Sequence, residues 1–191
     1  MIPSDTITMR LTGLRPLLMH SGRLCDPLDP VVRDLARLTS KRLKTVADHQ
    51  EIARVEWFGG LWLDGGIPCI PAEALEATFL SGARMQRRGP QAAAGLQVEG
   101  PARLFYDGPN DVDELWSHER FRLRVPVRVG TARTMRTRAR FDTWNVEFTA
   151  SFLPSLLSKS LIAEIFTVAG YARGLGDWRP KFGRFQAERL D

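Results

Sequence analysis

The change of hydrophobic periodicity along the chain is the feature that most limits which fold it can adopt. Some segments alternate apolar and polar side chains or form short apolar runs, which predicts strands, and others repeat apolar residues at helical spacing. Strands are predicted at residues 7–14, 61–63, 67–70, 96–106, 121–129, 141–152 and 185–189. Helices are predicted at residues 31–38, 45–58, 71–83 and 158–172. Because both types of element recur, we expect an α+β fold.

Turn and capping residues mark the ends of several elements. Residues 17–19 are apolar and are expected to continue the first strand after Pro16. Thr45 followed by Asp48 predicts a helix start. Asp64-Gly65-Gly66 predicts a hairpin turn between two short strands. Loops or turn-rich connections are expected at residues 86–95, 109–118 and 130–140.

The core elements follow the order strand, helix, strand, strand, helix, strand. This order is typical of a ferredoxin-like or RRM-like core with an antiparallel sheet. We therefore predict a single RRM-like domain over residues 1–191. A helical insertion is expected at residues 24–60, before the first core helix, and a basic β-hairpin with a long tip at residues 121–152.

The charge of the chain favours an anionic partner. The 191 residues carry a formal net charge of +5, and 23 of the 27 cationic residues are arginine. Arginine binds phosphate through two parallel hydrogen bonds and stacks on flat groups. The sequence has no apolar run long enough to span a membrane, no signal peptide and no CxxC pair, so we expect a reduced, cytoplasmic protein without a membrane partner.

Arginine is densest between residues 120 and 140, where eight arginines and no acidic residue occur. On a period of two, one row of side chains leaves one strand and a second row leaves the returning arm or the tip. The predicted phosphate-binding residues here are Arg122, Arg124, Arg128, Arg133, Arg136, Arg138 and Arg140. Such rows suit a nucleic-acid backbone. The alternative is a solvated basic face, or a surface that pairs with the acidic stretch 107–119.

The C-terminal segment 174–185 combines glycines, cations and aromatic residues. Glycines permit positive φ angles and a close approach of the backbone to a ligand. Cations bind phosphates and aromatic rings stack on bases. The predicted glycine-rich loop contains Gly174, Gly176 and Gly183, and its predicted nucleic-acid contacts are Trp178, Arg179, Lys181 and Arg184, with Phe182 as a second stacking candidate. The alternative is a helix C-cap at Gly174 followed by a proline-containing turn.

Few residues suggest catalysis. His20 and Arg23 leave the first strand together and are predicted phosphate contacts, and His20 is also a candidate acid or base in RNA cleavage. Asp29 lies in an acidic cluster with Asp26 and Asp34 that suits either a divalent cation or helix capping. No zinc-ligand spacing, phosphate-binding loop or dinucleotide fingerprint occurs, so no metal and no cofactor are expected.

Three segments together resemble the RAMP superfamily, the RRM-like subunits of CRISPR effector complexes. Residues 174–185, Gly-Leu-Gly-Asp-Trp-Arg-Pro-Lys-Phe-Gly-Arg-Phe, resemble its glycine-rich loop. Residues 67–77 resemble its strand-to-helix signature, with Ile70-Pro71 followed by Leu75. Residues 29–34 resemble the loop that holds the RNA-cleaving aspartate in some backbone subunits, and here that position is Asp29.

The resemblance implies a modified RRM fold with a hairpin thumb, for which residues 128–140 are the candidate. Backbone subunits of this family stack head to tail along single-stranded RNA, and most are not enzymes. The chain is short for such a subunit, so the resemblance favours a stand-alone relative, for example one encoded by a phage and acting in the cytoplasm of the infected bacterium.

Three functions follow as hypotheses. The first is a non-catalytic protein that binds single-stranded nucleic acid, with RNA favoured over DNA, and assembles along it. The second is an endoribonuclease that uses Asp29 or His20. The third is a protein-interaction module or decoy that docks on a nucleoprotein complex.

Overall fold

The computed structural model describes residues 3–191, apart from the side chain of Val129, and shows an α+β protein with an antiparallel sheet. The strands are β1 (Asp5–Gly13), β2 (Leu17–Met19), β3 (Leu63–Asp64), β4 (Ile67–Ile70), β5 (Leu96–Val98), β6 (Ala102–Tyr106), β7 (Arg122–Val129), β8 (Ala132–Phe141), β9 (Trp144–Phe152) and β10 (Phe185–Arg189). The helices are α1 (Pro30–Thr39), α2 (Val46–Gly60), α3 (Ala72–Met85), α4 (Gly89–Gly95), α5 (Val112–Ser117) and α6 (Lys159–Ala172), with short 3₁₀ turns η1 (Gly22–Cys25) and η2 (Glu119–Phe121).

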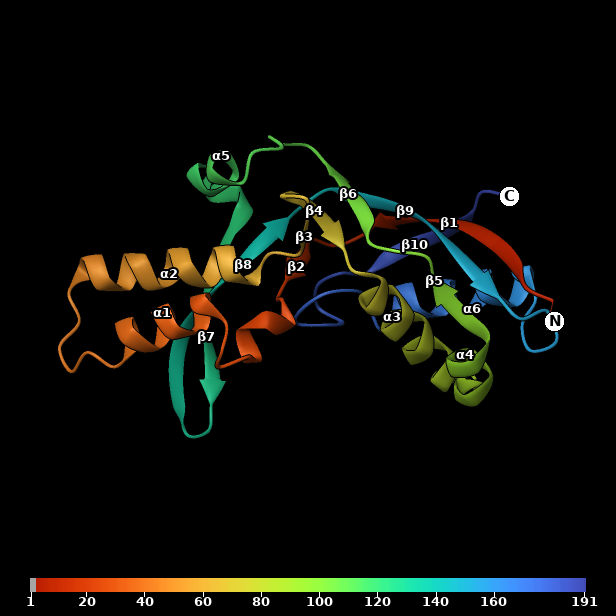
Figure 1. The fold of residues 1–191 in the computed structure, drawn as a ribbon, viewed down its shortest axis with the longest axis horizontal. Helices are drawn as coiled ribbons and strands as arrows, with labels where there is room; N and C mark the ends of the chain where they lie inside the picture. The colour runs from red at the N-terminus through yellow and green to blue at the C-terminus, as the bar shows by residue number, and fades with distance from the viewer. Residues whose placement is uncertain (1–2) are drawn as a thin grey trace.

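The larger sheet has the strand order β10-β1-β9-β6-β4-β3, and β5 also pairs with β9. Helices α3, α4 and α6 lie on one side of it (Figure 1). Alternate side chains of β1 and β9 point into the layer between sheet and helices and are buried, as their sequence pattern predicts. The ring of Phe166 in α6 lies 5.0 Å from Phe79 in α3 and 5.4 Å from Phe148 in β9, so the core joins both helices to the sheet.

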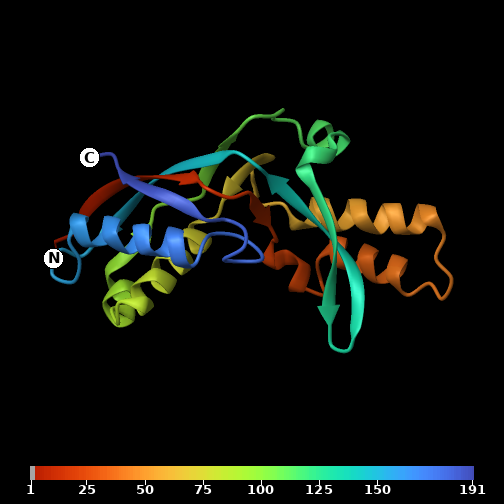
Figure 2. The ribbon, with the colours of Figure 1, turned by 180° about the vertical axis from the view of Figure 1, so that it is seen from behind.

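A second, three-stranded sheet of order β2-β8-β7 lies at the other end of the elongated molecule, beside α1, α2 and α5 (Figures 1 and 2). The buried Trp57 of α2 donates a hydrogen bond from Nε1 to the carbonyl of Phe121, 2.8 Å away, which fixes the helix to the start of β7. The two sheets are joined by the short connections from β1 to β2 and from β8 to β9. Trp144 Nε1 ties these connections together by donating to the carbonyl of Arg15.

Several expectations are confirmed. Thr45 and Asp48 form a complete capping box at the start of α2. Gly65 and Gly66 form the turn between β3 and β4. The two core helices, the alternating strand that ends at Phe152 and the C-terminal strand lie where the periodicity predicts them.

The expected long tip at residues 130–140 is wrong, because β8 occupies Ala132–Phe141 and only two residues turn the chain. The reason is that this arginine- and threonine-rich strand has few apolar side chains of its own and is held by pairing with β7 and β2. The returning strand β9 is a separate element of the other sheet. Residues 17–19 likewise do not extend β1 but pair with β8.

Two expected loops contain helices. Residues 89–95 form α4, and residues 112–117 form α5, which Asp111 caps by accepting a hydrogen bond from the Glu114 amide at 2.8 Å. The strand expected at residues 96–106 is split into β5 and β6. None of the helices within residues 3–191 combines the length and the apolar character needed to cross a membrane.

Candidate nucleic-acid interface

The pairing register of the β7–β8 hairpin separates its arginines onto two faces. Residues paired across an antiparallel ladder point to the same side of the sheet. Arg128 pairs with Arg133, and Arg122 and Arg124 share their face because they lie two and four residues apart in β7. Leu123 pairs with Arg138 and Val125 with Arg136, which puts the second arginine row on the opposite face.

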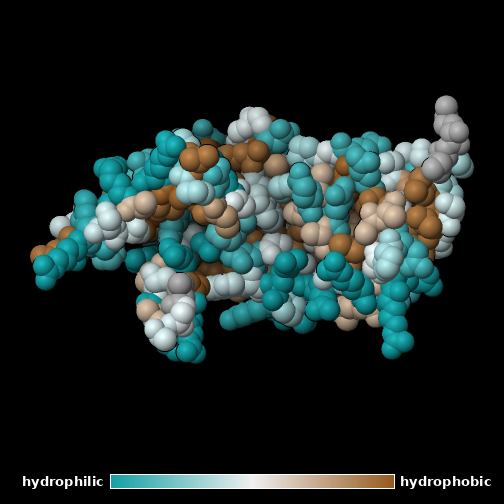
Figure 3. Space-filling model, turned by 60° about the horizontal axis from the view of Figure 1, so that its bottom comes forward, coloured by the Kyte–Doolittle hydropathy of each residue, from teal (hydrophilic) through white to brown (hydrophobic). Residues whose placement is uncertain are grey.

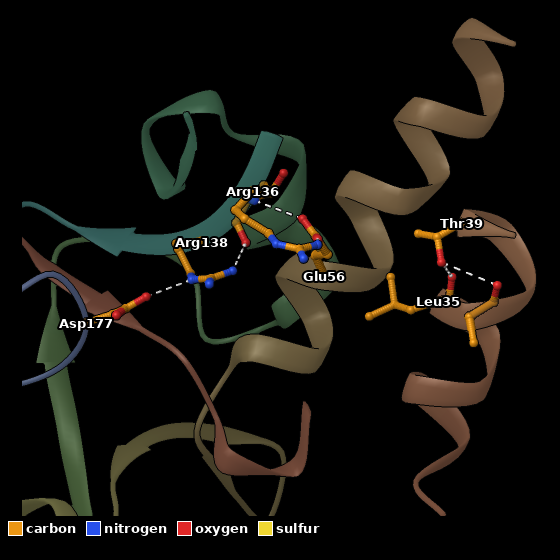
Figure 4. Close-up of polar contacts among 8 residues, drawn as sticks. Leu35, Thr39, Glu56, Arg136, Arg138 and Asp177 are labelled. Carbon is orange, nitrogen blue, oxygen red and sulfur yellow. Dashed lines mark hydrogen bonds and ion pairs between the residues drawn. The ribbon is translucent and has the colours of Figure 1, made fainter. Parts of the chain in front are cut away.

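The second row is engaged by acidic residues from elsewhere in the chain. Three ion pairs form: Arg136 with Glu56 at 2.5 Å, Arg138 with Asp177 at 2.8 Å, and Arg140 with Asp142 at 2.6 Å. Figure 4 shows Arg136 directed at α2 and Arg138 directed at the C-terminal loop. The charge of this row is therefore compensated inside the protein.

Glu56 occupies the edge of β8 where its pairing with β2 ends. The last pair on that side is Met19 with Ala139, and two residues earlier the amide of Thr137 donates to Glu56 Oε2 at 3.0 Å. Glu56 is 3% exposed and also accepts from Arg136. A carboxylate thus completes the hydrogen bonding of a strand edge and neutralises the neighbouring cation.

The first row consists of Arg122, Arg124, Arg128 and Arg133, and three of these arginines stay exposed and uncompensated. Arg124, Arg128 and Arg133 have no acidic side chain within ion-pair distance among residues 3–191. Arg128 donates from Nε to the carbonyl of Gly130. Of the whole run, Arg120 alone pairs with the acidic stretch 107–119 in the described chain, through Asp107 at 3.3 Å.

The glycines of the C-terminal loop serve close packing within the protein. Gly174 has φ +76° and donates to the carbonyl of Ala169, so it caps α6 as the structural alternative predicts. A Cβ at Gly176 would lie 2.4 Å from the carbonyl oxygen of Leu18, and one at Gly183 would lie 1.7 Å from that of Leu175. The backbone of Asp177 donates to the same Leu18 carbonyl. The conformations of Gly176 and Gly183 therefore bring the loop against β2.

The side chains at the loop's tip differ in their exposure. The exposed cations are Arg179, Lys181 and Arg184. The rings of Trp178 and Phe182 are partly buried and lie 6.1 Å apart, with Lys181 Nζ 5.8 Å from the Phe182 ring. This arrangement places two aromatic rings, tilted by 41° to each other, beside positive charge.

His20 lies in a cavity of about 270 Å³ together with Gly176, Asp177 and Arg179. Its Nδ1 is buried and has no hydrogen-bond partner within the described part of the chain. Burial lowers the pKa of His20 below its usual value, and the nearby Arg138 cation acts in the same direction. The imidazole is therefore neutral near pH 7.

Asp29 is engaged in local structure. It accepts two hydrogen bonds from Arg23, at 2.9 and 3.0 Å, and one from the amide of Val31 at the start of α1. The bond from Arg23 is the main cause that lowers the pKa of Asp29. Asp26 accepts from Leu28. Across residues 3–191 no three His, Cys, Asp or Glu side chains are grouped so that they could hold a metal ion.

The structure thus brings His20 and Arg179 together in one cavity and divides the hairpin arginines. The sequence did not predict that Glu56 pairs with Arg136 or that Asp177 pairs with Arg138. No local pattern marks either acidic residue as the partner of a hairpin arginine. No protein-family model matches the chain, and no curated protein shows significant similarity to it.

Proposed function

We propose that this protein binds single-stranded nucleic acid, with RNA preferred, and is not an enzyme. The observation that carries the proposal is the exposed row Arg124, Arg128 and Arg133, whose charge no acidic side chain of the described residues compensates. Figure 3 views the face from which the hairpin projects, where hydrophilic side chains predominate. Releasing counterions from a polyanion is the main source of affinity for such a surface.

The strand order supports a ferredoxin-like, RAMP-type core as part of the proposal. Counting β1, β6, β9 and β10 as the four core strands, the order β10-β1-β9-β6 is 4-1-3-2, with α3 and α6 as the two crossover helices. This arrangement is the one that the order of elements in a split β-α-β unit produces.

The open face of the sheet is a poor candidate for the ligand. There Arg10 is shared by Glu147 at 2.6 Å and Glu188 at 3.5 Å, so its charge is compensated. RRM domains stack bases on free aromatic rings of this face, whereas here the exposed ring of Phe105 lies under Arg103, whose guanidinium carbon is 5.7 Å from the ring centroid. We therefore propose that the nucleic-acid strand lies on the hairpin and the C-terminal loop, which the Arg138–Asp177 ion pair joins.

Assembly along the ligand belongs to the same proposal. The hairpin projects beyond the body of the protein (Figures 1 and 2), so it can reach a neighbouring copy on the same strand. Head-to-tail stacking in this way is the arrangement of the family that the sequence resembles.

The test is the salt dependence of binding to labelled single-stranded RNA and DNA. In the triple variant R124A/R128A/R133A, the slope of log K against log salt concentration should become less negative by about 2. Each lost phosphate contact reduces the magnitude of that slope by roughly 0.7. The control R33A/R37A/R42A changes the net charge equally on exposed residues near α1. Equal slopes in the wild type and the first variant would contradict the proposed interface. Absence of any nucleic-acid affinity would favour a protein-docking module.

RNA cleavage at His20 is a second candidate, favoured by its unpartnered, buried Nδ1 and lowered pKa. A neutral imidazole beside the cation Arg179 can accept a proton next to a bound phosphate. Cleavage of end-labelled RNA that H20A abolishes while binding persists would establish it. D29A is the parallel variant, and we expect no change in products because Asp29 is bonded to Arg23 and the α1 amide.

A further inference from the structure

A second cavity, of about 370 Å³, lies between α2, α5 and the face of the hairpin that carries Arg122 and Arg124. Its polar lining consists of Gln50, Trp116, Glu119, Arg122, Arg124 and Thr137. Pockets for small ligands usually measure roughly 300–1,000 Å³. The cavity is therefore large enough for a ligand of the size of one nucleotide.

Two residues that line this cavity each carry a buried polar side-chain atom without a hydrogen-bond partner among residues 3–191. These atoms are Arg122 Nε and Thr137 Oγ1, two of four such side-chain atoms within residues 3–191. Thr137 is only 2% exposed. Buried polar groups in native proteins are nearly always hydrogen-bonded, so a pair of unpartnered donors in one cavity points to a ligand that accepts from both.

The cavity is lined by two arginines, the residue type that binds oxyanions through paired hydrogen bonds. The guanidinium carbon of Arg122 lies 4.6 Å from the centroid of the Trp116 ring, which holds its plane in place. Arg124 follows two residues later on the same face and pairs in register with Thr137. Two arginines and a threonine thus occupy neighbouring positions on one sheet face and line the same cavity.

The number of donors distinguishes between kinds of phosphate. A phosphate within a nucleic-acid strand carries one charge, whereas a phosphate monoester carries about −1.5 to −2 and has three terminal oxygens. Three terminal oxygens can accept from Arg122, Arg124 and Thr137 at once. Glu119 and Gln50 supply an acceptor and an amide for hydroxyl or N–H groups of the rest of the ligand.

We propose that this cavity binds the phosphate monoester of a nucleotide, either free or at the end of a strand. The inference rests on the proposed function, because it assumes that the surface beside the cavity binds the rest of a nucleic-acid strand. Binding of a nucleoside monophosphate tests the cavity by itself.

The experiment is calorimetric titration with a nucleoside 5′-monophosphate and with the same nucleoside lacking phosphate, followed by oligonucleotides with a 5′-phosphate or a 5′-hydroxyl. T137V removes only the unpartnered hydroxyl and keeps the shape of the side chain, so it should fold as the wild type does. It should weaken monophosphate binding roughly ten-fold, the loss expected for one hydrogen bond to a charged group. R122K, which keeps the charge but lacks Nε, should do the same.

Two controls separate the cavity from its surroundings. T134V makes the same chemical change on the other face of β8 and should leave monophosphate affinity unchanged. R133A removes a cation of the first row outside the cavity and should weaken oligonucleotide binding alone.

Preference for 5′-phosphorylated strands would support the cavity as an end-recognition site, and tight binding of the monophosphate without that preference would support a free nucleotide as its ligand. Monophosphate binding without any oligonucleotide binding would support the cavity and overturn the proposed function. Equal binding of nucleoside and monophosphate, or wild-type affinity in T137V and R122K, would overturn the cavity proposal.

Discussion

Arg138 and Asp177 form an ion pair of 2.8 Å that joins the basic hairpin to the C-terminal loop. Arg138 is 9% exposed and donates a second hydrogen bond to the carbonyl of Thr137. The loop is fixed from the other side by Asp177 N and Gly183 N, which donate to Leu18 and Pro16. One charged contact between residues 39 positions apart therefore sets how the two proposed nucleic-acid-binding segments lie relative to each other.

Removing the acid of this pair should destabilise the protein more than removing the base. D177A leaves a buried guanidinium without its counter-charge, which costs about 3 kcal/mol, whereas R138M keeps an apolar stem and removes the charge. Urea unfolding of both single variants and of the double variant measures the coupling. D142N, at the exposed pair with Arg140, is the control and should change stability by less than about 1 kcal/mol. A larger loss in R138M than in D177A would contradict the expectation.

Glu56 should matter for the stability of the hairpin. E56Q keeps one acceptor oxygen for two donors, Arg136 and the Thr137 amide, and we expect a loss of about 2 kcal/mol. E51Q in the same helix is the matched control, because Glu51 is exposed and 3.8 Å from Arg54. Thermal unfolding followed by circular dichroism compares the two, and equal midpoints would show that Glu56 does not hold the strand edge.

Local signals in the sequence suffice for the elements that carry their own capping or periodicity. The capping box at Thr45, the glycine turn at Gly65 and the alternation of β9 each specify structure within a few residues. By contrast, β8 is stabilised by partners distant in sequence, and its arginines resemble a loop when taken alone. The prediction of where an element begins and ends is wrong where a tertiary partner, and not the local sequence, determines the conformation.

The candidate site was predictable in composition but not in pairing. The sequence shows that arginines alternate on the hairpin, but the acids that compensate Arg136 and Arg138 come from positions 80 and 39 residues away. The glycines of the C-terminal loop indicate positive φ angles, and the structure shows that the protein's own backbone, at Leu18 and Leu175, requires them. Long-range contacts of this kind leave no local trace in a single sequence.

Stability should fall as pH decreases below about 6.5, in part because of His20. Its folded-state pKa is lowered by burial and by Arg138, so the unfolded chain binds the proton first as the solution is acidified. The contribution is fully present above the unfolded pKa and is lost as pH falls toward the folded one. H20Q should flatten the decrease of the melting temperature between pH 7 and 5, whereas H118Q, at an exposed histidine, should not. An unchanged decrease in H20Q would show that His20 is not the titrating group.

Substitutions at two glycines with positive φ angles distinguish the cost of backbone strain from the cost of steric overlap. Gly65 has φ +55° with no atom within 4 Å of an added Cβ, so G65A should lower the free energy of unfolding by about 1 kcal/mol. Gly183 has φ +71°, and a Cβ there would lie 1.7 Å from the Leu175 carbonyl oxygen. G183A should therefore cost about 3 kcal/mol or more, because overlap with fixed backbone adds to the strain. Chemical denaturation of both variants measures the difference. Similar losses would mean that the loop moves away from Leu175 without penalty, and that its close packing does not fix the conformation of residues 174–185.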